Sequence, residues 1–168
     1  MKDATTILDG IVRSIETVGR SGSDDVYLDN VSFRVDAREL DVPHDSFRPA
    51  AEFNAAKLHE LCKPRSFDPE VGFFTVEANV IDSNFAFLQI LPVDYRADGR
   101  HVNMAVTLPC VDAVNELPQI VLTMEIFLHK VASALGVKPG HITFNVGVAF
   151  INWGDVTCAQ DREIEIPR

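Results

Sequence analysis

The chain has 168 residues, 46% of them hydrophobic and 24% charged, and its formal net charge is −10. This size and composition are typical of one globular domain over residues 1–168, which can bury a core without a metal or disulfide staple. The negative charge argues against nonspecific nucleic-acid binding, and no apolar run approaches the roughly 18 residues that span a bilayer. We therefore expect neither a nucleic acid nor a membrane as partner.

The amino-terminal residues and the cysteines indicate the compartment. Acidic residues lie within the first turns and no small-residue cleavage site follows, so we do not expect a signal peptide. Cys62, Cys110 and Cys158 are widely spaced and form no CxxC pair. This favours reduced thiols in a cytoplasmic protein, with neither a disulfide framework nor a metal site.

The first half of the chain predicts two helices around a strand. Apolar residues recur at helical spacing before Gly19, namely at Leu8, Ile11, Val12, Ile15 and Val18. A polar turn follows, and residues 26–37 alternate as a strand or a bulged pair of strands. Residues 50–64 have good helix propensity and end at Pro64, whereas residues 41–49 are a loop.

The second half predicts a sheet around one long helix. Residues 71–81 and 84–93 carry apolar side chains at odd and even positions alike, as in strands covered on both faces. Residues 94–100 are a turn and 101–110 a strand. A buried helix then opens at Pro118 and ends at Gly136. Residues 141–153 alternate as another strand, and 162–166 are a candidate edge strand. The predicted class is α+β.

Several motifs between Asn103 and Gly140 occur in a fixed order without a gap: Asn103-Met104 within a predicted strand, then Asp112, Leu117-Pro118, Leu128-His129 and the sequence GVKPG. This order resembles the core of thymidylate synthase and its pyrimidine nucleotide hydroxymethylase relatives. Weaker similarities extend the resemblance over most of the chain. Residues 95–100 are similar to an Ala-Asp-Gly hairpin, Gln89 to the glutamine after the catalytic cysteine, and residues 19–23 to an Arg-Thr-Gly-Thr phosphate loop.

The resemblance implies a mixed β-sheet packed on a long buried helix, with one sheet face forming a homodimer. A second copy of the chain on that face is also physically reasonable, because strands that are apolar on both faces need a layer on each side. The resemblance further implies a nucleotide-like small-molecule ligand, one-carbon transfer at C5 of a pyrimidine, and reduced folate as a candidate cofactor. The family's large helical insertion and its folate-closing tail are missing.

The reactive residues of the family are also missing. Asn84 lies where the family has its cysteine nucleophile, and asparagine cannot take that role. Pro109 and Cys110 replace a phosphate-binding arginine and its neighbouring serine, and Ile120 replaces the base-reading asparagine. In this last strand Val148 replaces an aspartate, and Phe150 and Asn152 replace the His-x-Tyr pair that holds the sugar. What remains is mostly framework.

Candidate catalytic residues are Cys110, Asp112 and His129. Cys110 is either a displaced nucleophile or a small buried hydrophobe. Asp112 either contacts a ligand's amide edge or caps the turn before the helix. His129 is either a functional base or a satisfied interior group.

Candidate ligand-binding residues are Arg20, Arg65, Asn84, Gln89, Asn152 and Trp153. The two arginines match phosphate ligands of the family, Arg65 one that reaches across the dimer interface; the alternative for each is an exposed surface arginine. Asn84 and Gln89 present amides to a ligand or satisfy buried backbone groups. One side of the last strand and its end carries His141, Asn145, Asn152 and Trp153, and this side faces either a cavity or solvent.

Three functions stay open at this point. The first is a divergent thymidylate-synthase-like protein that binds or modifies a pyrimidine nucleotide or related heterocycle; if it is an enzyme, it is a transferase-like relative of thymidylate synthase. The second is a catalytically inactive homologue that serves as a dimeric scaffold or partner-binding module. The third sets the resemblance aside and places a site around Cys110 and His129.

Overall fold

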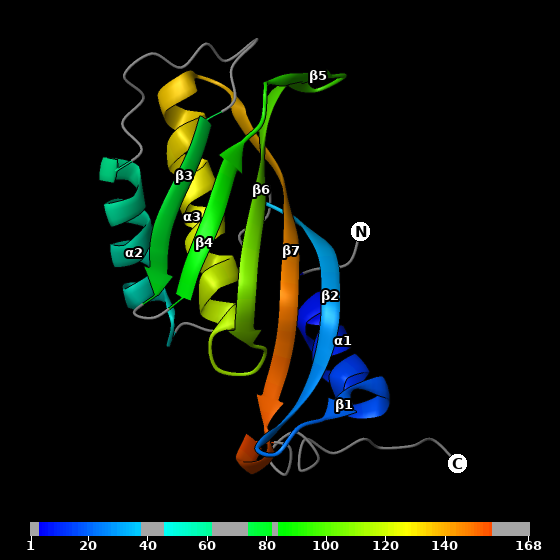
Figure 1. The fold of residues 1–168 in the computed structure, drawn as a ribbon. Coiled ribbons are helices and arrows are strands. Elements are labelled where there is room, and N and C mark those ends of the chain that lie inside the picture. The colour runs from blue at the N-terminus through cyan, green and yellow to red at the C-terminus, as the bar shows by residue number, and fades with distance from the viewer. Residues whose placement is uncertain (1–3, 38–45, 62–73, 82–83, 156–168) are drawn as a thin grey trace.

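The computed structural model describes residues 4–37, 46–61, 74–81 and 84–155. Figure 1 shows the elements in chain order: α1 (Ala4–Val18), β1 (Arg20–Ser21), β2 (Asp25–Asp36), α2 (Arg48–Leu61), β3 (Phe74–Ile81), β4 (Asn84–Ile90), β5 (Asp94–Arg96), β6 (Gly99–Asp112), α3 (Leu117–Leu135) and β7 (Lys138–Asn152). The predicted α+β class is confirmed. The predictions for Pro64 and residues 162–166 lie outside the described residues.

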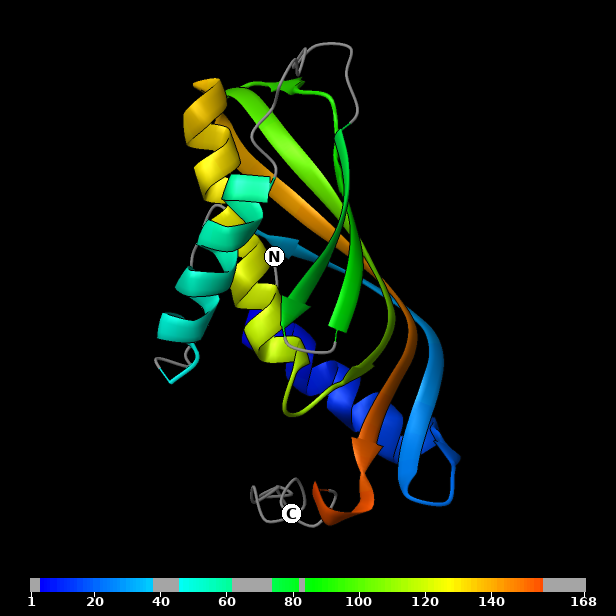
Figure 2. The ribbon, with the colours of Figure 1, turned by 60° about the vertical axis from the view of Figure 1, so that its left-hand side comes forward.

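The strands form one mixed seven-stranded sheet in the order β1-β2-β7-β6-β4-β3, with β5 paired to β6. Only β6 and β7 run parallel among the described pairs, and α3 makes the crossover between them. Helices α1, α2 and α3 all lie on one face of the sheet (Figures 1 and 2). No described helix or strand covers the opposite face, which we call the open face.

Helix α3 is the centre of the core, as its apolar spacing predicted. Buried residues point to every side of it, among them Ile120, Met124, Phe127 and Leu128. Pro118 lies in its first turn, and Gly136 ends it in the left-handed conformation at φ 66°. A glycine adopts this conformation without the steric cost that a side chain brings.

Some local predictions need correction. Val18 is 68% exposed, because α1 ends there and turns its last residue away from the sheet. The polar turn after Gly19 contains the short strand β1, and the turn at residues 94–100 is the β5–β6 hairpin. In β4, Ala86 and Leu88 are buried but Phe87 is 40% exposed, so in the described chain this strand is covered on one face only.

Three strands change their side-chain alternation in the same row, at Asn30 of β2, Gly147 of β7 and Pro109 of β6. Asn30 takes a left-handed φ of 55°. On each strand, the residues that face the helices are even-numbered on one side of the row and odd-numbered on the other. In β2 they are Val26 and Leu28 before the row, and Val31, Phe33 and Val35 after it. In β7 they are Ile142, Phe144 and Val146 before it, and Ala149 and Ile151 after it; in and after β6 they are Val102, Met104, Val106 and Leu108 before it, and Val111 and Ala113 after it. Because all three strands switch together, their register is unbroken across this row, and apolar residues stay on the helix side of these strands.

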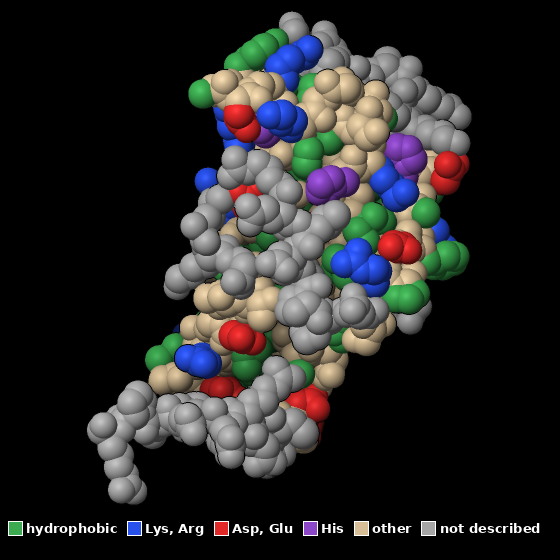
Figure 3. All heavy atoms as spheres, turned by 180° about the vertical axis from the view of Figure 1, so that it is seen from behind, with side chains coloured by type: hydrophobic (Ala, Val, Ile, Leu, Met, Phe, Trp, Pro, Cys, Tyr) green, Lys and Arg blue, Asp and Glu red, His purple; other side chains and the backbone are tan. Residues whose placement is uncertain are grey.

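The helix side of the molecule bears acidic and basic side chains that are interspersed, without a large field of one sign among the described residues (Figure 3). No helix in the described part of the chain combines the length and apolar character that crossing a bilayer requires.

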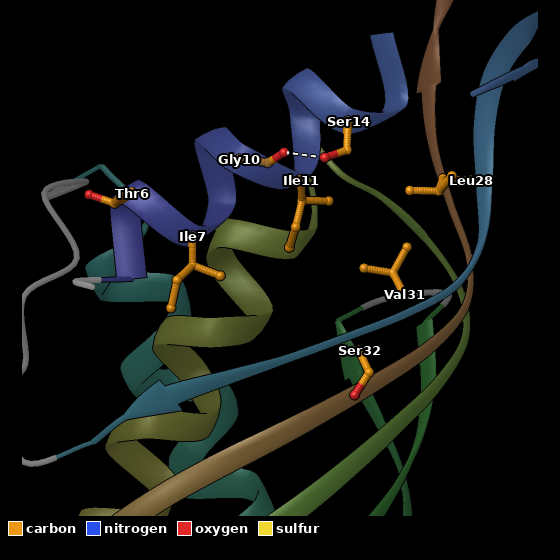
Figure 4. A pocket seen from close by; sticks show the side chains of 8 residues that line it. All are labelled: Thr6, Ile7, Gly10, Ile11, Ser14, Leu28, Val31 and Ser32. Atoms are coloured by element: carbon orange, nitrogen blue, oxygen red, sulfur yellow. Dashed lines mark hydrogen bonds between the residues drawn. The ribbon is translucent and has the colours of Figure 1, made fainter. Parts of the chain in front are cut away.

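A groove of about 300 Å³ lies between α1 and β2. Ile7 and Ile11 of α1 face Leu28 and Val31 of β2 across it, and Gly10 lies at its rim (Figure 4). A Cβ added at Gly10 would meet no atom within 4 Å. Gly10 thus has no steric reason to be glycine.

We expect Gly10→Ala to raise the free energy of unfolding by about 0.5–1 kcal/mol, since alanine loses less conformational freedom in a helix interior. Urea denaturation followed by circular dichroism would measure this. An unchanged or lower stability would show that α1 does not pack on β2 with the open space seen here.

Candidate functional site

A row of side chains crosses four strands at the end of the sheet where β6 and β7 finish. Arg20 of β1 pairs with Tyr27 of β2, Tyr27 with Phe150 of β7, and Phe150 with Asp112 of β6. Residues paired in this way present their side chains on the same side of a sheet. In this row that side is the open face, because the neighbours Val26, Val111 and Ile151 are buried on the helix side. We call this row, together with Cys110 and Asn152, the strand-end patch.

Asp112 is the best-connected residue of the patch, and it is 5% exposed. Its Oδ1 accepts from the backbone N–H groups of Val114 and Asn115, at 2.9 and 3.0 Å. Its Oδ2 accepts from Nδ2 of Asn115 and Nδ2 of Asn152, both at 3.0 Å. This is the geometry of a turn cap, and it also fixes the amide of Asn152 at the end of β7.

The loop that leads into α3 is held from both of its ends. Glu116 Oε2 accepts from the backbone N–H of Asp112 at 3.0 Å, so the turn closes on itself just before the helix. Asn115 Nδ2 also donates to Asp155 Oδ2 at 3.0 Å, which ties the loop to the segment after β7. Of the two roles considered for Asp112, capping is the one its hydrogen bonds serve.

Arg20 and the two aromatic side chains form the other half of the patch. Arg20 is largely exposed and forms an ion pair with Asp29 at 3.4 Å. Tyr27 and Phe150 are half-buried between Arg20 and Asp112. The patch thus has a cation at one end, two aromatic side chains in the middle, and fixed amide and carboxylate groups at the other end. This arrangement suits a planar ligand that carries an anionic group.

Trp153 follows Asn152 directly, and its backbone N–H donates to Asp24 O at 3.1 Å. Its side chain is 44% exposed. Trp153 is therefore adjacent in sequence to the patch residue Asn152, and part of its side chain is open to solvent.

Cys110 and His129 are not brought together. Cys110 is exposed on the open face, next to Val148 of β7. His129 lies on α3, behind the sheet, and its Nε2 donates to the carbonyl of Ala37 at 2.6 Å. No hydrogen bond or ion pair links Cys110 to a basic group anywhere in the described ranges. A thiol and its base must lie within hydrogen-bonding reach to act together, and this pair does not.

The remaining candidates lie away from the patch or outside the described residues. Gln89 pairs with Ala105 in the middle of the open face. Asn84 begins β4, two strands away from β7. Arg65 falls outside the described residues. Among the residues the structure describes, no group of three or more His, Cys, Asp or Glu side chains could hold a metal ion.

Tyr27 was missed in the sequence, although it sits between Arg20 and Phe150. Its place depends on the pairing of β2 with both β1 and β7, which no local pattern reveals. By contrast, Asp112 and Asn152 were found in the sequence, Asp112 in the loop after a predicted strand and Asn152 near the end of another, both through the family resemblance.

Comparison with models of known protein families and with curated proteins finds no match to this chain.

Proposed function

We propose that this chain is a divergent protein of thymidylate-synthase-like fold that binds a pyrimidine nucleotide, or a related heterocycle with an anionic group, at the strand-end patch. The observation that carries this function is the row Arg20, Tyr27, Phe150 and Asp112 across four strands. Arg20 would bind the anionic group, the aromatic side chains would contact the ring, and Asn152 would contact its polar edge.

Binding is better supported than chemistry. The Asp112 carboxylate already accepts four hydrogen bonds, so it is poorly placed to take a proton from a ligand. The exposed thiol of Cys110 has no basic partner in the part of the chain described here. One-carbon transfer at C5, or altered chemistry on the same ring, and reduced folate as its cofactor enter only through the family resemblance.

A second copy of the chain on the open face belongs to the same proposal. The exposed ring of Phe87 and the absence of a covering helix among the described elements support a second layer there. The centre of this face is more polar than the sequence suggested, with Ser32 donating to Asn145 Oδ1 at 3.1 Å across β2 and β7. The proposed dimer contact is therefore a mixed polar and apolar one.

Titration with dUMP, dCMP, UMP and CMP tests the function, with Trp153 fluorescence and calorimetry as readouts. We expect saturable binding of at least one nucleotide, and weaker binding of its nucleoside. Arg20→Gln should weaken nucleotide binding roughly tenfold, the worth of one charge-assisted hydrogen bond, without affecting the nucleoside. Arg13→Gln is the matched control, because Arg13 is an exposed arginine on α1.

The dimeric scaffold is the second candidate, favoured by the fully bonded state of Asp112 and the isolation of Cys110. If none of the four nucleotides binds at millimolar concentration, nucleotide binding is wrong. A dimer in light scattering that Phe87→Glu converts to a monomer would then support the scaffold. A monomer without nucleotide affinity would contradict both candidates.

A further inference from the structure

A polar cluster occupies the opposite end of the open face, where β7 begins. Arg96 of β5 donates from Nε to Asp94 Oδ2 at 3.0 Å and from one terminal nitrogen to Asn103 Oδ1 at 3.0 Å. The same nitrogen lies 3.2 Å from His141 Nδ1. Asn103 Oδ1 also accepts from the backbone N–H of His141 at 3.0 Å. Four side chains from three strands are thus fixed relative to one another.

These bonds decide which nitrogen of His141 carries the proton. A guanidinium can only donate, so Nδ1 of His141 must accept from Arg96 and the ring proton is on Nε2. Burial, with the positive charges of Arg34 and Arg96, lowers the pKa of His141 against the opposing charges of Asp94 and Asp36. The imidazole is therefore neutral at pH 7 and offers one N–H donor on Nε2.

Arg34 is the uncommitted cation beside this histidine. It lies on β2, is exposed, and makes no hydrogen bond or ion pair with any residue that the structure describes. Its Cα partner is Thr143, two residues from His141 on the same side of β7. Asp94 is bound to Arg96. Asp36, the Cα partner of His141, has an interaction of its own and lies two residues from Arg34 along β2.

We propose that Arg34, Thr143 and the Nε2–H of His141 form a binding site for the oxyanion of a small ligand, either a phosphate monoester or a carboxylate. Thr143 lies directly opposite Arg34, about 5 Å away, and His141 lies diagonally to it at about 7–8 Å, which the long arginine side chain can span. Such oxygens accept hydrogen bonds from guanidinium, hydroxyl and imidazole N–H groups. The cluster behind His141 holds its tautomer, so the donor is in place before the ligand arrives. This site is distinct from the strand-end patch.

The test is an NMR titration of the whole protein, with sodium phosphate or sodium acetate added at constant ionic strength against sodium chloride. We expect saturable shifts of the His141 ring signals and a rise in the pKa of His141, because a bound anion favours the imidazolium form. A stronger response to phosphate than to acetate would identify the phosphate monoester as the ligand class. The reverse order would identify the carboxylate.

Variants separate this site from the rest of the surface. Arg34→Gln should weaken anion binding at least tenfold, whereas Arg34→Lys, which keeps the charge, should bind with intermediate affinity. Arg13→Gln and Arg20→Gln should leave the response of His141 unchanged. The site is refuted if chloride gives the same shifts, if Arg34→Gln keeps full binding, or if Arg20→Gln alone abolishes the response. The last result would place the anion at the strand-end patch instead.

Discussion

Replacing Asp112 by alanine is expected to lower the free energy of unfolding by about 3 kcal/mol, because four donors lose their acceptor at once. Two of these donors are the backbone N–H groups of Val114 and Asn115, which the carboxylate holds in the turn before α3. The other two are the side-chain amides of Asn115 and Asn152. Urea denaturation of the variant and the parent chain would measure the loss. We expect the free energy of unfolding to fall equally steeply with urea concentration in both.

The matched control is Asp9→Ala on the exposed face of α1, for which we expect a change within about 0.5 kcal/mol. If the two variants were equally stable, Asp112 would not hold the turn. The Asp112 variant should also bind nucleotides more weakly under the proposed function, since Asn152 would lose its fixed orientation. Stability and binding then report two separate consequences of one carboxylate.

Gly147→Ala is expected to lower the free energy of unfolding by about 2–3 kcal/mol, because overpacking against backbone cannot be relieved by a side-chain rotation. A Cβ at this position would come within 2.5 Å of the Pro109 carbonyl oxygen on β6. The two strands approach closely here because the side-chain alternation changes in this row. Thermal and urea denaturation would both detect the effect.

Gly10→Ala serves as the control for this prediction, since it makes the same chemical change in open space and should have the opposite sign. A Gly147 variant as stable as the parent would mean that β6 and β7 are further apart at this row than the structure indicates. The strand-end patch, which begins one row away at Cys110, would then have a different shape.

The helices were predicted well because their signals are local. Apolar spacing, Pro118 in the first turn and Gly136 at the end are sufficient to define α3, and the same spacing defines α1 up to Val18. The change of alternation at Asn30, Gly147 and Pro109 could not be predicted in this way. It is a property of three strands together, and on any one strand it looks like a break in the pattern.

The candidate site was predictable to the same extent. Asp112 and Asn152 lie at the ends of two strands that run parallel, so their meeting follows once the strands are recognised. The contribution of Tyr27 depends on a long-range pairing, and so does the position of His129 behind the sheet. Sequence patterns place residues on an element, whereas the packing of elements decides which of them meet.

The pairing of β2 with β7 also affects how the chain is made. Asp25 pairs with Asn152, so β2 can pair with β7 only after β7, the last described strand, has left the ribosome. Contacts so distant in sequence slow folding, and until they form the apolar side of β2 has only α1 to cover it. During synthesis, the apolar side of β2 therefore stays partly uncovered until β7 has been made.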